Sequence, residues 1–271
     1  MAPSKTISIL LLFISLQNYT QAQEVFDSSP ELDLPLLIGS STLFAAGYAV
    51  QSNIPALEEA DIAGLSPDDV NPLDRNAIGY YIQSNALYSD VAVGAMMVAP
   101  LSVFFYEQAR KEFWPIVIIG AETAAFINGL VSLSKGTFRR VRPFVYDEQV
   151  PLENKTTAYA REAFFSGHTS NAATFGFLSA YMIDQYTDNK AVEIIAWTVG
   201  TSVPLLTGIF RFRSGNHFPT DIIAGYLIGG GTGILIPWLH RVQNSDRTRN
   251  GWPKNLVVMP SGFGARAVLY F

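Results

Sequence analysis

The sequence contains no cysteine and only three histidines among its 271 residues. The absence of cysteine excludes disulfides, thiolate nucleophiles and thiolate metal ligands. Three histidines are also too few for a multinuclear histidine metal site. Charged residues are scarce, at 15% of the chain, and the formal net charge is -5. Because nucleic-acid-binding proteins carry a basic surface, we expect no nucleic-acid partner.

Apolar residues, in contrast, make up 49% of the chain, and the mean hydropathy is +0.20. This hydropathy is high for a soluble protein and low for a chain made mostly of membrane spans. Long runs rich in Ala, Leu and Ile show little strand-like alternation and therefore favour helices. These runs are residues 35–50, 91–106, 114–133, 171–183, 191–210 and 222–239. The sequence predicts an all-α fold, a bundle of apolar helices with one helix for each run.

Two features favour a bundle that is embedded in a membrane. Small residues recur at every fourth position, as in Gly225, Gly229 and Gly233, and such stripes permit close helix contact inside bilayers. Three of the four tryptophans lie at or near the ends of apolar segments, as in an interfacial belt. A soluble helical core would use the same stripes, however, and Glu122 and Asn128 interrupt the third segment. Membrane embedding is the favoured interpretation, with a soluble bundle as the alternative.

The two ends of the chain differ from its apolar middle. Lys5, the apolar run "ISILLLFISL" and a small-residue site ending at Ala22 predict a signal peptide over residues 1–22, because the run is too short for a membrane span. A main domain is predicted over 23–240 and a tail over 241–271. In the tail, β-prone runs flank the sequence Pro-Ser-Gly-Phe-Gly, which predicts a small β-hairpin.

The distribution of basic residues predicts which loops face the cytoplasm. Arg110 and Lys111 lie between the second and third segments, and four more cations follow the last one. If these loops are cytoplasmic, the loops after the third and fifth segments face outward. An exported chain begins outside, however, and six spans would reverse this arrangement. One hypothesis resolves the conflict: residues 35–50, interrupted by Gly39 and Ser40, do not fully cross the membrane.

The first of three polar clusters follows the third segment and has the sequence "KGTFRRVRPF". It brings Lys135, Arg139, Arg140 and Arg142 close together. A cationic flank beside an apolar helix is common and would by itself explain the cluster. Under the topology above, however, the cluster lies on the side where basic residues should be depleted. We therefore expect an anionic partner.

The second cluster lies in "FFSGHTSNAATFGF", where a glycine and two hydroxyl residues surround one of the histidines. Ser166 can cap the helix that begins near Gly167, and the free N–H groups of a first helical turn favour anions. His168 falls in that turn and would face whatever is bound. The alternative is a capping serine beside a solvated histidine.

The third cluster, "FRFRSGNHFPTD", contains Arg211 and Arg213, whose guanidinium forks suit phosphate oxygens. His217 and Asp221 are four residues apart, so the carboxylate can reach one ring nitrogen and leave the other free as a nucleophile. The alternative is that Asp221 only stabilises the start of a helix. His240, at the end of the last segment, is interpreted as structural.

Together the three clusters resemble the tripartite signature of the type 2 phosphatidic acid phosphatase superfamily, which includes membrane lipid phosphatases, class A bacterial acid phosphatases and vanadium-dependent haloperoxidases. The matching residues are Lys135 with Arg142-Pro143, then Ser166-Gly167-His168, then Arg211 with His217 and Asp221. The resemblance covers residues 130–240, and the signature itself spans 135–221. The chain departs from the usual pattern at Phe165 and Phe210, where the family commonly has proline and serine. Both departures concern the pocket walls and not the reacting groups.

The resemblance implies a role for each residue. His217 would attack phosphorus to give a phosphohistidine, with Asp221 orienting it, and His168 would protonate the leaving oxygen and then activate water. The groups implied to bind the phosphate oxygens are Lys135, Arg142, Ser166, Gly167 and Arg211. The resemblance implies no metal and no cofactor, and vanadate would bind as a phosphate mimic.

The sequence therefore predicts a metal-independent hydrolase, with a type 2 phosphatidic acid phosphatase domain over 23–240 that acts on phosphomonoester or pyrophosphate groups of membrane lipids. We expect it in the inner membrane of a Gram-negative-type bacterium, with the site facing the periplasm. Three alternatives stay open: a soluble periplasmic non-specific acid phosphatase, a vanadium-dependent haloperoxidase, and a non-enzymatic membrane scaffold or transporter.

Overall fold

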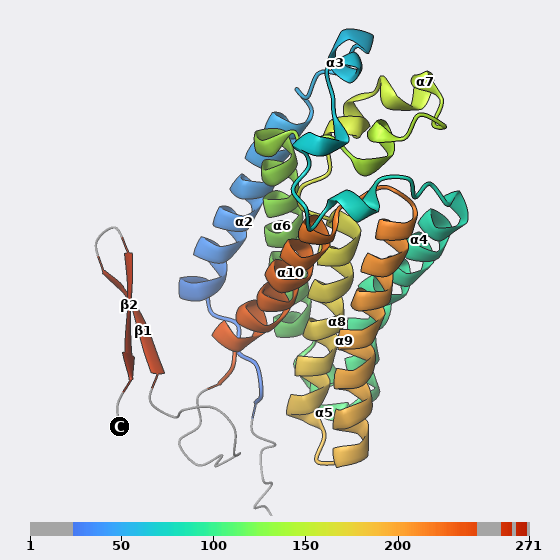
Figure 1. Cartoon of the computed structure of the whole chain (residues 1–271). Helices are drawn as coiled ribbons and strands as arrows, with labels where there is room; N and C mark the ends of the chain where they lie inside the picture. The colour runs from blue at the N-terminus through green and yellow to red at the C-terminus, as the bar shows by residue number, and fades with distance from the viewer. Residues whose placement is uncertain (1–23, 243–255, 262–263, 270–271) are drawn as a thin grey trace, which may run out of the picture. The chain divides into compact units, whose positions relative to one another are not determined.

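The computed structural model describes residues 24–242, 256–261 and 264–269. Over these residues the chain forms long helices joined by short helical turns (Figure 1). The long helices are α2 (Pro30–Gln51), α4 (Gln83–Val98) with the 3-10 helix η3 (Ala99–Phe105) that continues it, α6 (Phe113–Phe138), α8 (Gly167–Tyr186), α9 (Lys190–Arg213) and α10 (Pro219–Leu239). Each of them coincides with one predicted apolar segment, and the predicted helical bundle is confirmed.

Short helices and turns fill the connections between the long helices. They are α3 (Glu59–Ala63), η1 (Pro67–Asp69), η2 (Arg75–Ala77), α5 (Glu107–Lys111), η4 (Pro143–Tyr146), α7 (Leu152–Lys155) and η5 (Ala158–Arg161). Figure 1 shows α3 and α7 at one end of the bundle and α5 at the other. At the end with α3 and α7, α6 and α9 finish while α8 and α10 begin. All three polar clusters of the sequence lie at this end.

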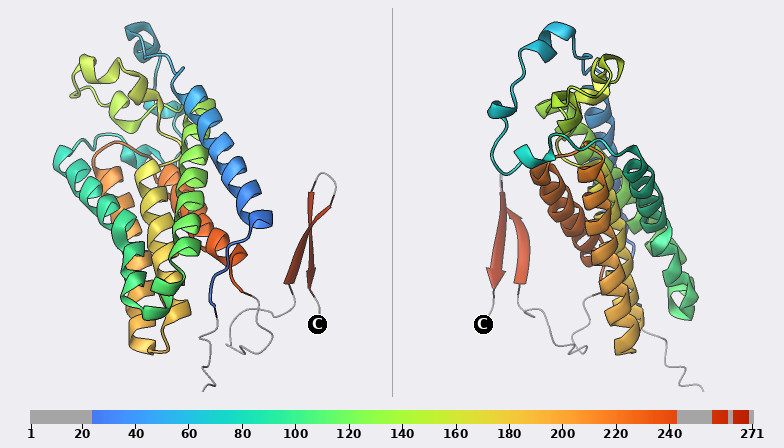
Figure 2. Two further views of the ribbon diagram at one scale, coloured as in Figure 1. Left: turned by 180° about the vertical axis from the view of Figure 1, so that it is seen from behind. Right: turned by 45° about the vertical axis from the view of Figure 1, so that its right-hand side comes forward.

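α8 is the central helix of the bundle. It packs against α4, α6, α9 and α10 (Figure 2), and 13 of its 20 residues are buried. Because its neighbours surround it, α8 can carry polar residues such as Thr169, Ser170 and Thr174 in the interior. The Thr174 hydroxyl, for example, donates to the Gly229 carbonyl of α10 at 3.0 Å. Burial therefore explains why this segment looks short and weakly apolar in the sequence.

The surface of the bundle is apolar over most of its length. Within the described residues, five helical segments are long and apolar enough to cross a membrane, and α8 is not among them. Large apolar side chains point outward from these segments, for example Ile38, Val91, Trp114, Ile194 and Leu227. A soluble protein rarely exposes so much contiguous apolar surface. The protein is therefore a membrane protein.

Glycines on α10 allow this helix to approach α8 closely. A Cβ atom at Gly229 would lie 2.2 Å from the backbone oxygen of Ser170, and one at Gly225 would lie 2.7 Å from that of Ser166. Gly233 meets the backbone oxygen of Thr174 in the same way, at 2.2 Å. No side chain fits in these gaps. The small-residue stripe predicted for this segment is therefore a helix-packing surface.

α2 packs against α6 and differs from its prediction. The sequence hypothesis treated residues 35–50 as interrupted at Gly39 and Ser40, but α2 is one continuous helix of 22 residues. A Cβ atom at Gly47 would lie 2.5 Å from the backbone oxygen of Gly129 in α6. The small residues let the two helices pack closely and do not end α2. α2 is therefore unbroken, and it is long and apolar enough to cross a membrane. The hypothesis that this segment does not fully cross stays a prediction.

The segment before α2 is anchored at the end of the bundle that carries α5. The backbone N–H groups of Val25 and Phe26 donate to the two Glu112 oxygens at 2.9 and 3.0 Å. The Tyr186 hydroxyl at the end of α8 donates to the same carboxylate at 2.6 Å. Phe26 is buried and forms a bridge with Arg241 after α10. Glu112 thereby ties together three parts of the chain.

The contacts divide the chain into two compact units, one extending through Arg241 and one beginning at Val242. In the second unit, β1 (Leu256–Ser261) pairs antiparallel with β2 (Gly264–Leu269), with Leu256 opposite Leu269. This confirms the predicted hairpin. The signal peptide proposed over residues 1–22 lies outside the described residues and stays a prediction, as do the domain limits.

Candidate active site

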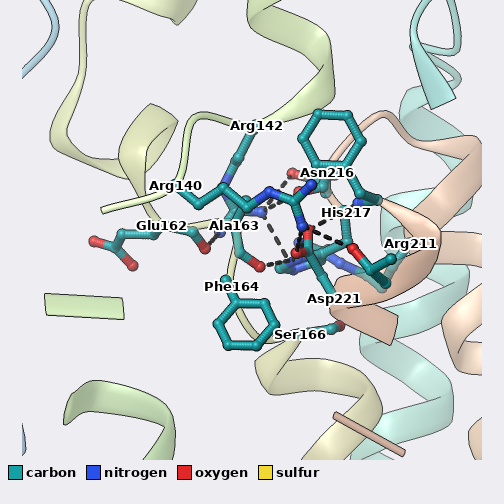
Figure 3. Close-up of polar contacts among 12 residues, drawn as sticks. Arg140, Arg142, Glu162, Ala163, Phe164, Ser166, Arg211, Asn216, His217 and Asp221 are labelled. Atoms are coloured by element: carbon teal, nitrogen blue, oxygen red, sulfur yellow. Dashed lines mark hydrogen bonds and ion pairs between the residues drawn. The ribbon is translucent and has the colours of Figure 1, made fainter. Parts of the chain in front are cut away.

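Residues from all three clusters lie close together in one site, and Figure 3 shows Arg142, Ser166 and His217 among them. Lys135 lies in the last turn of α6 and Arg142 just precedes η4. Ser166 caps α8, Arg211 lies in the last turn of α9, and His217 lies in the short loop before α10. Residues that are up to 82 positions apart in the chain therefore share one site.

His217 is held in a single orientation. Its side chain is buried, and Nδ1 donates to the Ala163 carbonyl at 2.7 Å. This bond places the ring proton on Nδ1 and leaves a lone pair on Nε2, which lies 3.3 Å from Arg142 Nη1. Burial, together with the charges of Arg142, Arg211 and Lys135, holds the pKa of His217 well below its ordinary value. The ring is therefore neutral at neutral pH, with Nε2 available as a nucleophile.

Asp221 lies beside His217 but is not its hydrogen-bond partner. Its Oδ2 is 3.8 Å from His217 Nδ1, which is within reach of an ion pair but beyond a hydrogen bond. The carboxylate instead accepts from the Phe218 N–H at 2.9 Å and forms an ion pair with Arg140. The expected orienting bond is thus corrected: the Ala163 carbonyl takes that place, while Asp221 caps α10 and is held by Arg140.

Arg142 is buried and fixed by backbone oxygens. Nε donates to the Tyr159 carbonyl at 2.8 Å, Nη1 to that of Asn216 at 2.9 Å and Nη2 to that of Glu162 at 2.9 Å. The guanidinium also lies 3.7 Å from the centre of the Tyr159 ring. Carbonyl dipoles satisfy the donors without neutralising the charge. Arg142 therefore contributes a full positive charge next to His217 Nε2.

Two further cations lie close by. Lys135 Nζ is 3.4 Å from Glu162 Oε2, and it would be only 3.7 Å from a Cβ atom placed at Gly167. Arg211 is buried, and its Nη2 donates to the Tyr159 hydroxyl at 2.9 Å. Arg211 Nε has no hydrogen-bond partner among the residues that the structure describes. A buried donor without an acceptor is costly, and a bound anion would satisfy it.

The start of α8 supplies the remaining groups. The Ser166 hydroxyl accepts from the Thr169 N–H at 3.4 Å, which confirms the predicted cap. Gly167 is the first residue of the helix. His168, in the first turn, places Nε2 2.8 Å from Asp90 Oδ1 of α4. Because unsatisfied N–H groups at a helix start favour anions, this terminus adds to the positive potential of the site.

The pKa of His168 is set by opposing neighbours. Burial and the charge of Arg211 lower it to about 4, although the Asp90 carboxylate acts in the opposite direction. The positive charge of Lys135 lowers it further. His168 is therefore a weak base in this site, and any added negative charge next to it would favour its protonated form.

A cavity of about 600 Å³ opens onto this cluster. His168 and Arg211 contribute to its wall, together with Tyr159 and Asn216. The Tyr159 hydroxyl donates to Asn216 Oδ1 at 2.6 Å, and both residues also contact Arg142. The cavity therefore reaches the cations through a wall that holds them in place.

A family comparison covers this part of the chain. Residues 114–245, which contain all three clusters, match the family model of the PAP2 superfamily. Residues 114–245 belong to the PAP2 superfamily.

Individual relatives of this PAP2 region are distant. Lipid A 1-phosphatase of Porphyromonas gingivalis is 24% identical over 154 residues, which cover 56% of this chain and 30% of that protein. Phosphatidylglycerophosphatase B of Bacillus subtilis is 27% identical over 139 residues, which cover 49% of this chain and 60% of that protein. The matched part thus spans less than two thirds of either curated relative. The crystal structure of a transmembrane PAP2 type phosphatidylglycerolphosphate phosphatase from Bacillus subtilis is similar at 18% identity, with a TM-score of 0.46, over 80% of this chain and 98% of that one.

Sequence reasoning missed several residues of the candidate site. Ala163 and Tyr159 act in part through backbone atoms, so no side-chain pattern could have revealed them. Asp90 lies in α4, outside the three motifs. The sequence feature that could have indicated Asp90 is its position directly before an apolar segment, where a single acidic residue is unusual. Asp74 pairs with Arg140 at 2.6 Å and was hidden in a long polar connection.

Proposed function

We propose that this protein is a phosphatase that hydrolyses phosphomonoester or pyrophosphate groups of membrane lipids through a phosphohistidine intermediate. The observation that carries the proposal is the environment of His217. One ring nitrogen donates to a backbone carbonyl, and the other lies 3.3 Å from Arg142. No carboxylate of the described residues pairs with Arg142, whose donors bind backbone oxygens. This arrangement pairs a neutral nucleophile with cations that would hold the phosphate it attacks.

In the first step His217 Nε2 attacks phosphorus, and the bond from phosphorus to the leaving oxygen breaks. His168 gives a proton to that oxygen, so the leaving group departs as an alcohol or a protonated phosphate. In the second step His168 removes a proton from water, and the resulting hydroxide attacks the phosphohistidine. Inorganic phosphate leaves and His217 Nε2 regains its lone pair.

The cations stabilise the charge that develops on the transferring group. Lys135, Arg142 and Arg211 would contact the non-bridging oxygens, together with the Ser166 hydroxyl and the Gly167 N–H. Donors of this kind contribute about 3–4 kcal/mol each to transition-state stabilisation. Because they do the work that magnesium does in many phosphoryl-transfer enzymes, the proposed reaction needs no metal and no cofactor. Vanadate would compete for the same groups as a phosphate mimic.

A lipid substrate is supported by the surroundings of the cavity. Its wall includes Gln83, Ala86 and Asp90 of α4, a helix that exposes Leu87, Val91 and Val98. An acyl chain could lie against this apolar face while the phosphate reaches the cations. The curated relatives carry the names of lipid phosphatases. We propose the inner membrane of a Gram-negative-type bacterium as the location, with the site on the periplasmic side.

The test is phosphate release by purified protein in detergent, with EDTA in the assay buffer. Substrates are phosphatidate, phosphatidylglycerol phosphate, a lipid A phosphate, undecaprenyl pyrophosphate and a soluble aryl phosphate. Turnover of a lipid that is lost in His217→Ala supports the proposal. Equal turnover of the aryl ester would favour a non-specific acid phosphatase. No turnover by folded protein, but halide oxidation with added vanadate, would favour a haloperoxidase.

The intermediate has its own test. In His168→Asn the attack on phosphorus can still occur with an activated aryl phosphate, whose leaving group needs no acid. The second step lacks its base, so labelled phosphate should stay on His217 and survive denaturation at alkaline pH. His217→Ala is the matched control and should carry no label. Label in both variants would contradict the assignment of His217 as the nucleophile.

A further inference from the structure

Two carboxylate side chains and one imidazole lie close together at the end of the bundle opposite the proposed active site. Asp33 lies in the first turn of α2, Glu122 lies within α6, and His240 caps the end of α10. His240 Nε2 is 3.2 Å from Asp33 Oδ1 and 3.2 Å from Glu122 Oε2. One ligand atom from each of the three residues lies within 4.8 Å of the other two. Figure 1 shows the start of α2 and the end of α10 side by side.

His240 presents a lone pair to the two carboxylates when its ring is neutral. Nδ1 donates to the Ile236 carbonyl at 2.9 Å, which places the proton of the neutral ring on that nitrogen. Nε2 then faces two anionic oxygens without a proton to offer them. A backbone carbonyl that accepts the Nδ1 proton is the usual support for a histidine that binds a metal through Nε2.

Glu122 is the second observation that points to a ligand. The Glu122 side chain is buried, with an exposed fraction of 1%. Within the described residues neither of its carboxylate oxygens accepts a hydrogen bond. No lysine or arginine of the described residues forms an ion pair with Glu122 or with Asp33. Burying a carboxylate without a positive partner is unfavourable. Within the described residues only His240, in its protonated form, could balance the two carboxylates, whereas a bound cation would balance them with the ring neutral.

Asp33 has the support that a metal ligand needs. The Ser28 hydroxyl donates to Asp33 Oδ2 at 2.7 Å and leaves Oδ1 directed toward His240. The carboxylate of a metal site is commonly held by such a hydrogen bond from outside the ligand shell. One oxygen of Asp33 is thus fixed by Ser28, and the other faces His240 Nε2 at 3.2 Å, where a metal could bind between the two atoms.

We propose that Asp33, Glu122 and His240 bind a divalent metal ion of the zinc class. One imidazole and two carboxylates are a ligand set that zinc accepts, with water in the fourth position. Ligand atoms about 2.0–2.2 Å from a tetrahedral ion lie about 3.3–3.6 Å from one another, close to the 3.2 Å separations here. The ion would join α2, α6 and α10 where the chain enters and leaves the bundle. It is structural and lies apart from the phosphate-binding cations.

The test measures zinc in the full-length protein purified in detergent and dialysed against a zinc-buffered solution. We expect about one zinc ion per chain in the wild type and almost none in Glu122→Gln or His240→Gln. Glu112→Gln is the matched control, because Glu112 is a buried acid at the same end that is not among the three ligands. The Glu112→Gln protein should be less stable to heat but should keep its zinc. Equal zinc in all four proteins, or none in the wild type, would overturn the proposal.

A second measurement uses the wild type alone, in case the variants fail to fold. Removal of metal with a strong chelator should lower the midpoint of thermal unfolding, and added Zn²⁺ should restore it in a saturable way, whereas Mg²⁺ should not. If the midpoint changes neither on removal nor on addition of zinc, the proposal is overturned. The cluster would then be a protonated histidine between two carboxylates. Lipid phosphate release by stripped, folded protein should persist. The outcome of this test is thus separate from that of the phosphatase assays.

Discussion

The two ends of the bundle bury charge of opposite sign. At the end where α8 and α10 begin, Arg142 and Arg211 are buried, and within the described residues Arg142 pairs with no carboxylate. At the other end Glu122 and Asp33 are buried without a lysine or arginine partner in the same described part of the chain. A fold keeps uncompensated charge in its interior only at a cost. The sign of the buried charge matches the ligand proposed for each end: a phosphate at one end and a metal ion at the other.

α6 connects the two ends. It carries Glu122 in its first half and Lys135 in its last turn, about 13 residues apart, or about 20 Å along a helix. A disturbance of α6 packing would affect both sites, whereas a change confined to one end should leave the other intact. The predictions below use this separation, beginning with the largest expected effect.

His217→Ala should break the reaction at the cationic end without changing its charge. The ring is neutral, so its removal leaves Lys135, Arg142 and Arg211 in place. We expect turnover of a lipid phosphate to fall by at least about 10³-fold. Binding of inorganic phosphate, measured by calorimetry, should change by less than about tenfold. Loss of phosphate binding together with turnover would show that His217 helps to bind the anion and is not simply the nucleophile.

Arg142→Lys tests whether the position of the charge matters as well as its sign. An ammonium group cannot serve three carbonyls in the planar geometry of a guanidinium. We expect kcat to fall about 10²-fold to 10³-fold. Arg139→Lys is the matched control, because Arg139 donates to the Gly136 carbonyl of its own helix and lies outside the site. Similar kcat values for the two variants would contradict the role of Arg142.

Gly229→Ala tests the packing that holds the two ends at a fixed distance. The added methyl group would lie 2.2 Å from the Ser170 carbonyl of α8. A methyl group at Gly231 in the same helix would have no heavy atom within 4 Å among the described residues, apart from the adjacent backbone of α10 itself. Overpacking should lower the free energy of unfolding by about 1–3 kcal/mol, seen as a lower midpoint in thermal denaturation. Gly231→Ala should be neutral. Equal midpoints for both variants would contradict the close contact of α8 and α10.

Asp90→Asn should shift the pH dependence of the reaction. The Asp90 carboxylate raises the pKa of His168 against burial and Arg211, so its removal lowers that pKa below about 4. A smaller fraction of His168 is then protonated at any higher pH, and the alkaline limb of kcat/KM should move to lower pH. At neutral pH we expect a loss of less than about tenfold. The control is Glu107→Gln, an exposed acid outside the site, which should leave the profile unchanged.

The sequence predicted the helices well because each has a long apolar run. It underestimated α8 and α10 at their starts, where Gly167, Pro219 and their neighbours form helical turns that are not apolar. The residue types and their positions identified the three clusters, and the resemblance to the phosphatidic acid phosphatase signature predicted that they meet in one site. The sequence could not identify Asp90 or Ala163 as partners of the histidines, because those contacts depend on how α4 and the segment before α8 pack against the site.

The error over Asp221 has a similar origin. Asp221 lies four positions after His217, and this spacing allows a direct bond. Arg140, which belongs to another cluster, pairs with the carboxylate instead. Competition among several partners in a crowded interior is a tertiary property. The interpretation of His240 as structural drew on its position alone, and the acids that face it come from α2 and α6.

The way in which Arg142 is held affects how this protein can change over evolutionary time. Its three donors bind main-chain oxygens of Tyr159, Glu162 and Asn216. Every amino acid offers the same oxygen at those places, so the guanidinium keeps its position when the side chains are replaced, provided that the loop keeps its path. The side chains of the cavity wall can thus change, and with them the head group of the proposed lipid substrate, while the charge of Arg142 stays in place. New substrate preferences can arise in this site without rebuilding its reactive centre.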